Sequence, residues 1–130
     1  MRYDSLTEFL QIGRDTLTVG PIAVILIEDD VEVDTTLRHH HELGFKTIVA
    51  LMPADFKLPK DVNAFVHRVD YDATTHSAVE TAINAVTDAA SAGVWMYYCF
   101  NAEYLFFPFC ESRSIGEMLA FHTEERRASM

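Results

Sequence analysis

The chain has 130 residues, of which 49% are hydrophobic and 23% are charged. This length and composition are typical of one folded domain and exclude an intrinsically disordered chain. The longest apolar runs, Ile22–Ile27 and Val94–Phe100, are far shorter than the roughly 20 residues that cross a bilayer, so the sequence predicts no transmembrane segment. Because no apolar signal-peptide stretch follows Met1, we expect a cytoplasmic protein.

The charge distribution argues against nucleic acid as a partner. Ten Lys and Arg stand against twenty Asp and Glu, which gives a net charge of −10. The basic residues are scattered along the chain, so they form no basic stripe to neutralise the phosphates of a nucleic acid. The two cysteines, Cys99 and Cys110, lie in apolar sequence without Cys-x-x-Cys spacing, which favours buried free thiols over a disulfide.

Helices and strands alternate through the first half of the chain. Ser5–Glu8 fits a capping box, in which a serine and a glutamate satisfy amide groups at a helix start. The continuous apolar run Ile22–Ile27 predicts a strand. Helical spacing then extends from about Val31 to Leu43 and ends at Gly44, and Thr47–Leu51 predicts the second strand.

The second half repeats this alternation. Ala64–Val69 and Val94–Phe100 have the length and composition of strands, and a second capping box, Ser77–Glu80, predicts a helix between them. Tyr104–Phe107 is a fifth candidate strand, placed at a sheet edge by the proline that follows it. A third capping box, Ser114–Glu117, predicts a last helix.

These elements together predict the fold class. Strands that are apolar throughout are typical of parallel sheets covered on both faces, and alternating helices supply the cover through right-handed crossovers. We therefore expect a single α/β domain over residues 1–130, with a three-layer, mainly parallel, Rossmann-like sheet flanked by helices. The first strand should be central, beside the second and fourth strands.

Two polar segments follow predicted strands, where open parallel sheets bind ligands. Glu28, Asp29 and Asp30 come directly after the first strand, and Asn101 and Glu103 come directly after the fourth. We predict that the first three contact a ligand and that Asn101 and Glu103, spaced i and i+2, hold a hard divalent cation. The structural alternatives are acids that favour a helix start through its dipole, and an ordinary turn after a buried strand.

The histidine run His39–His41 does not predict a metal site. Adjacent residues of a helix point about 100° apart and therefore do not converge on one ion. His40 shares a helix face with Val33 and Leu37. We expect His40 to be a hydrogen-bonded, partly buried residue.

Three sequence patterns occur in order between Ile22 and Phe106. Ile25–Asp29 is a strand with an acidic tip, His40–Gly44 is a His-x-x-x-Gly helix end before the next strand, and Trp95–Leu105 is an apolar strand that runs into Asn101-Ala102-Glu103. Together they resemble the glycosyltransferase family 2-like proteins with a GT-A nucleotide-sugar fold. The chain departs from that family in having no Asp-x-Asp. After the second strand, Met52–Asp55 also replaces the acidic segment that would contact the nucleotide base in that family.

The resemblance implies a nucleotide-sugar donor held at Glu28, Asp29 and Asp30. It also implies Mg²⁺ or Mn²⁺ at Asn101 and Glu103, where the cation would stabilise the departing diphosphate during glycosyl transfer. A separate carboxylate would deprotonate the acceptor hydroxyl, and we assign no residue of this chain to that task. Because family members are considerably longer, the chain corresponds to their N-terminal, donor-binding part, which alone need not be active.

A second resemblance leads to a different class of function. Val24–Val33 resembles the first strand and acidic pair of response-regulator receiver domains, and the length also fits. Tyr104–Phe109 is similar to their final Lys-Pro-Phe element, but Phe107 stands where the lysine belongs. The alternative function is therefore a degenerate receiver-like signalling or interaction module without catalysis.

The aromatic segment Tyr104–Phe109 also predicts self-association. It carries more apolar surface than one short edge element readily buries, and soluble monomers seldom expose such a patch. We therefore expect a homo-oligomer that covers part of this segment or the last predicted helix.

Overall fold

The computed structural model describes residues 1–91 and 93–103, and its strands form one parallel sheet. The sheet has the strand order β1-β4-β3-β2-β5. Every neighbouring pair is parallel, and β2 lies between β3 and β5, which confirms the predicted central position of the first long strand. The strands are β1 (Arg2–Tyr3), β2 (Ile22–Leu26), β3 (Thr47–Met52), β4 (His67–Asp70) and β5 (Met96–Phe100).

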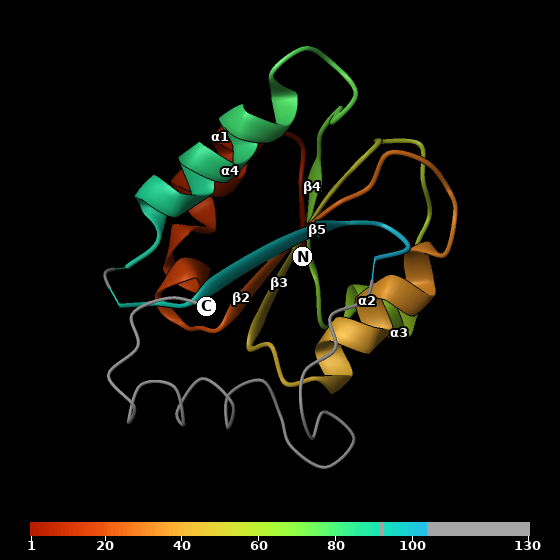
Figure 1. Cartoon of the computed structure of the whole chain (residues 1–130), viewed down its shortest axis with the longest axis horizontal. Coiled ribbons are helices and arrows are strands. Elements are labelled where there is room, and N and C mark those ends of the chain that lie inside the picture. The colour runs from red at the N-terminus through yellow and green to blue at the C-terminus, as the bar shows by residue number, and fades with distance from the viewer. Residues whose placement is uncertain (92, 104–130) are drawn as a thin grey trace.

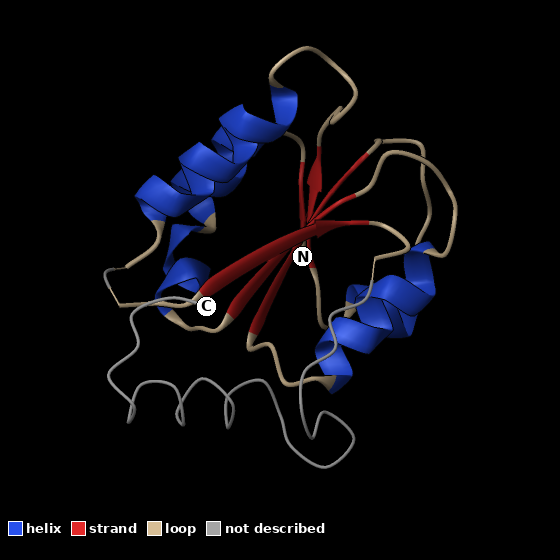
Figure 2. Cartoon of the chain, viewed as in Figure 1, coloured by secondary structure: helices blue, strands red, loops and turns tan. Residues whose placement is uncertain are grey.

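Helices cover both faces of the sheet, which confirms the predicted three-layer α/β fold. Helices α1 and α4 lie on one side of the strands, and α2 and α3 lie on the other (Figure 1). The same sandwich is seen with the helices in blue on either side of the red strands (Figure 2). The helical elements are α1 (Leu6–Ile12), the 3₁₀ helix η1 (Arg14–Thr18), α2 (Val33–Glu42), α3 (Lys60–Asn63) and α4 (Ala78–Ala89).

The direction of the chain explains this division of the helices. The chain moves outward from β2 through β3 to β4, with α2 and α3 as connections, and α4 then carries it back to β5 on the other side of β2. Right-handed crossovers that run in opposite directions along a sheet place their helices on opposite faces.

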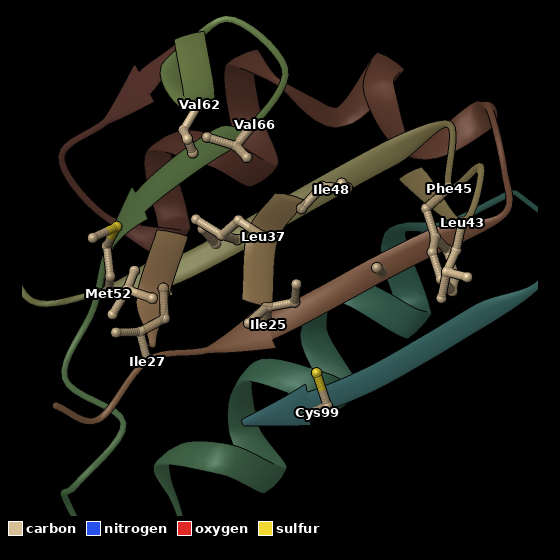
Figure 3. Close-up of a cluster of buried hydrophobic side chains, with 13 residues drawn as sticks. Ile25, Ile27, Leu37, Leu43, Phe45, Ile48, Met52, Val62, Val66 and Cys99 are labelled. Carbon is tan, nitrogen blue, oxygen red and sulfur yellow. The ribbon is translucent and has the colours of Figure 1, made fainter. Parts of the chain in front are cut away.

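The central strand is buried on both faces, which is why its sequence is apolar throughout. Ile25 and Ile27 pack with Leu37 and Ile48 on the α2 side (Figure 3). On the opposite face, alternate residues of the same strand pack against Phe9 and α4. All five residues of β2 are buried, as expected for a strand between two helical layers.

The predicted ends of helices and strands were confirmed in part. Ser5 caps α1 as predicted, because its Oγ accepts a hydrogen bond from Glu8 N at 3.1 Å. Gly44 follows α2 with φ 100°, the left-handed conformation expected at a helix end. The capping box predicted at Ser77 was wrong: Ser77 precedes α4, but its φ of 59° is left-handed rather than the extended backbone typical of an N-cap residue, and its side chain makes no capping bond. The strand predicted from Ala64 begins at His67.

Several predictions fall outside the described residues. These are the strand Tyr104–Phe107, the helix that begins near Ser114, and Cys110. Within residues 1–91 and 93–103, no helix has both the length and the apolar character needed to cross a membrane.

Candidate functional site

The carboxyl ends of the strands form one edge of the sheet, which we call the carboxyl edge. In register, Leu26 of β2 pairs with Leu51 of β3 and with Phe100 of β5. The segments that follow these strands, residues 27–32, 53–59 and 101–103, therefore leave the sheet at the same end. The strand order reverses between β2 and β5, because the chain leaves β2 toward β3 and returns on the other side. Ligands of open α/β sheets bind at such a switch point.

Asn101 joins the two strand ends at this switch point. Its Oδ1 accepts a hydrogen bond from Glu28 N at 3.0 Å. Its Nδ2 donates to Asp29 Oδ1 at 2.7 Å and to Val31 O at 2.8 Å. The loop after β2 is thus folded around the amide side chain of the residue that follows β5, 70 or more residues later in the chain. The structure brings together the two segments that the sequence predicted to share a site.

The end of β5 is a tight turn in which Glu103 has a structural role. Glu103 Oε1 accepts a hydrogen bond from Phe100 N at 2.6 Å, and Glu103 N donates to Phe100 O at 3.3 Å. Ala102 between them has φ 65°, a left-handed conformation that is unfavourable for a residue with a Cβ. Its N–H donates to Thr36 Oγ1 of α2 at 2.8 Å, which ties the turn to the helix.

A buried polar group under this turn connects α2 to β5. His40 is fully buried, and its Nδ1 lies 2.8 Å from Thr36 O, so the Nδ1–H donates and Nε2 faces the Cys99 thiol at 3.9 Å. Burial lowers the pKa of His40, and it raises the pKa of Cys99 to about 12. Both groups are therefore neutral at pH 7. The predicted hydrogen bond of His40 is confirmed, although its side chain is fully rather than partly buried, and the predicted free buried thiol at Cys99 is confirmed.

The predicted ligand-binding acids lie on the surface of the carboxyl edge. Glu28, Asp29 and Asp30 are all exposed. Asp29 Oδ1 also accepts a hydrogen bond from Val31 N at 3.0 Å, which rigidifies the loop. No cluster of three His, Cys, Asp or Glu side chains placed to hold a metal occurs in the described part of the chain. Asn101 and Glu103 engage different protein partners, and their role as a cation pair stays a prediction.

A cleft of about 520 Å³ lies beside these acids. It opens between the start of α2 and the loop after β3. Sequence reasoning missed Phe56 and Lys57, which form its far wall, although the strand-end rule that selected residues 28–30 applies equally to the loop after β3. The cleft is lined by Asp30, Glu32, Val33, Asp34, Thr35, Phe56 and Lys57.

The fold and the carboxyl edge define a class of protein: a Rossmann-like, all-parallel α/β protein with acidic residues at its switch point and a cleft beside them, between the start of α2 and the loop after β3. Comparison with known proteins adds no narrower assignment, because no family model, no curated protein and no solved structure matches the chain.

Proposed function

We propose that the carboxyl edge binds a nucleotide-sugar donor and that the chain is a glycosyltransferase-like donor-binding domain. The observation that carries this proposal is the hydrogen-bonded junction of Asn101 with the loop after β2. This junction holds the predicted ligand-binding acids at the point where Rossmann-like sheets bind nucleotides. The resemblance of Ile25–Asp29 and Trp95–Leu105 to family 2-like glycosyltransferases supports the sugar nucleotide over other nucleotides.

A divalent cation is part of the proposal for an electrostatic reason. The acids Asp30, Glu32 and Asp34 line the cleft with one lysine, so a diphosphate that enters alone meets excess negative charge. Mg²⁺ and Mn²⁺ prefer oxygen ligands, and Mg²⁺ is usually held by one or two carboxylates plus substrate phosphates rather than by a full protein cage. The exposed carboxylates of Asp29 and Asp30 would share this ion with the predicted cation pair, Asn101 and Glu103, and the absence of a three-ligand cluster in the described residues is compatible with a shared ion. The cation would neutralise the diphosphate as it departs.

The cleft offers a place for the nucleoside. Phe56 is half-buried in its wall and provides an apolar surface against a base. Asp30 and Asp34 are carboxylates, which accept hydrogen bonds from ribose hydroxyls. Lys57 adds a positive charge beside the path of the phosphates.

The strand order supports this function over the receiver-like alternative. Receiver domains have the flavodoxin-like order, in which the third strand lies beside the first. Here β4, the third of the long strands, pairs with β3 and lies two positions from β2. Asp70, at the end of β4, is in ion pairs with Arg2 and Arg68 rather than open to phosphorylation.

Calorimetric titration with uridine diphosphate and Mn²⁺ tests the proposal. We expect binding that requires Mn²⁺ and that weakens at least tenfold in Asp30→Asn. The matched control, Asp88→Asn, removes the same charge from the exposed surface of α4 and should bind normally. Absence of binding for a panel of nucleoside diphosphates would refute the proposal. An aspartyl phosphate formed from acetyl phosphate would instead support the signalling module.

Two further parts of the proposal concern the whole protein. We place it in the cytoplasm, where nucleotide sugars are made available to such enzymes. We also expect a homo-oligomer formed through Tyr104–Phe109 or the last predicted helix. Light scattering at micromolar concentration, with Phe106→Ser as the disrupting variant, tests the second part. A monomeric mass for the unaltered chain would contradict it.

A further inference from the structure

A buried arginine lies under the loop that forms the far wall of the cleft. Arg68 of β4 is only 4% exposed. Its Nη2 donates hydrogen bonds to Pro53 O and Ala54 O, both at 3.1 Å, and its Nε lies 3.5 Å from Asp70 Oδ1. The carbonyls that it holds belong to the first two residues after β3, just before Phe56 and Lys57.

A second arginine, from the neighbouring strand, contacts two of these partners, Ala54 and Asp70. Arg2 of β1 donates to Ala54 O at 2.9 Å and to Asp70 Oδ2 at 3.0 Å. Arg2, Arg68 and Asp70 thus form one group, which we call the arginine clamp. Short strand β1 pairs in register with β4, Arg2 opposite Arg68, and this places both guanidinium groups beneath one loop.

The clamp is poorly explained as a stabilising element of the core. Burial of a guanidinium costs free energy that an ion pair repays only with good geometry, and apolar replacements of buried ion pairs are often neutral. Among the described residues, Arg68 Nε and Asp70 Oδ1 make no hydrogen bond, so the pair is incomplete. The two arginines instead spend three hydrogen bonds on loop carbonyls, which fixes where the chain goes after β3.

We propose that the arginine clamp positions Phe56 and Lys57 for the ligand, which makes Arg2 and Arg68 positioning residues of the cleft. This inference rests on the proposed nucleotide function for its ligand, but the position of the loop can be tested without any ligand. The turn that leads into the wall is closed by a hydrogen bond from Phe56 N to Pro53 O at 3.2 Å. Pro53 O is also an acceptor of Arg68, so the exchange rate of the Phe56 amide reports directly on the clamp.

The experiment measures amide exchange by NMR and uridine diphosphate affinity with Mn²⁺ in the full chain. Arg2→Gln changes an exposed side chain and should leave the fold intact, while Arg68→Met is the buried variant. We expect about tenfold faster exchange at Phe56 and about tenfold weaker affinity in each, because each loses charge-assisted hydrogen bonds to the loop. Urea midpoints verify that the variants remain folded. Arg14→Gln is the matched control, because it removes the same charge from an exposed side chain of η1 that belongs to neither the clamp nor the cleft.

Each result decides one part of the inference. Unchanged exchange at Phe56 in both variants overturns the clamp, whatever the nucleotide does. Faster exchange with unchanged affinity shows that the clamp holds the loop but does not serve the cleft, and it also overturns the proposal. If the unaltered chain binds no nucleoside diphosphate, the proposed function fails and the exchange data alone decide whether the clamp holds the loop. Restored exchange and affinity in Arg2→Lys, which keeps the charge, would support the positioning role over general loss of structure.

Discussion

Replacement of Asn101 by aspartate should damage the protein more than replacement by alanine. Asn101→Ala removes three hydrogen bonds, which hold Glu28 N, Asp29 Oδ1 and Val31 O. Because water reaches this exposed edge and replaces part of them, we expect a loss of about 1–2 kcal/mol in the free energy of unfolding. Asn101→Asp keeps the acceptor for Glu28 N, but it replaces the Nδ2 donor by a carboxylate oxygen that faces Asp29.

The repulsion between these two carboxylates sets the additional cost. Unit charges 4 Å apart repel by about 1 kcal/mol in water and by about 4 kcal/mol at the effective dielectric constant of a protein surface. We therefore expect Asn101→Asp to lose about 2–4 kcal/mol at pH 7. The difference from the unaltered chain should shrink near pH 4, where the introduced carboxyl group takes up a proton and can donate again.

Urea unfolding of the three chains at pH 7 and near pH 4 measures these differences. An Asn101→Asp chain as stable as the unaltered one at pH 7 would refute the reasoning. Added Mn²⁺ supplies a second readout: if a cation binds at this edge, it should stabilise Asn101→Asp more than Asn101→Ala, because only the former offers it a new carboxylate. Equal effects of Mn²⁺ on both variants would argue against a cation at this position.

Three further predictions test the surroundings of the edge. Burial lowers the pKa of both His40 and His67 below the unfolded value of about 6.5, so the unfolded chain binds more protons than the folded chain as the pH falls below 6.5, and the free energy of unfolding should decrease there. Urea midpoints at pH 5.5 and at pH 8 measure this decrease, which should be smaller in His40→Gln. Ala102→Gly should raise the free energy of unfolding by up to about 1 kcal/mol, because it relieves the left-handed conformation at φ 65°; an unchanged urea midpoint would contradict this. In a Cys110→Ser background, Cys99 should resist thiol reagents at pH 8 until urea unfolds the chain, because burial raises the pKa of the thiol to about 12; fast labelling of the folded chain would be inconsistent with that burial.

The sequence predicted the parts of the fold that depend on regular patterns. Ile22–Ile27 is apolar at every position, and only a strand covered on both faces needs that, so its central place could be inferred. The neighbouring strands Thr47–Leu51 and Val94–Phe100 were placed beside it correctly. Such a pattern lies in consecutive residues, and it can therefore be recognised from the sequence alone.

Elements that depend on distant contacts could not be predicted in the same way. Strand β1 has two residues, too few for any pattern, and exists because Arg2 and Tyr3 pair with β4. The hydrogen bonds of Asn101 join residues about 70 positions apart, and no local signal distinguishes this asparagine from one in an ordinary turn. The prediction at Ser77 was wrong for the opposite reason. Its local sequence fits a capping box, but its backbone is left-handed and its side chain makes no capping bond.

The acids after β2 are more numerous than helix formation requires. Acids stabilise a helix when they lie in its first turn, where they meet the exposed amides and the helix dipole. In α2 this explains Asp34, which lies in that turn, but the helix begins at Val33 without a side-chain capping bond. Glu28, Asp29 and Asp30 lie three to five residues before it, outside the reach of that effect. Asn101 holds the loop that carries these acids through its hydrogen bond to Asp29 Oδ1, and Thr36 of α2 accepts a hydrogen bond from Ala102 N at the end of β5. We propose that a cation shared with a diphosphate binds beside these acids, because Mg²⁺ is usually held by one or two carboxylates together with substrate phosphates.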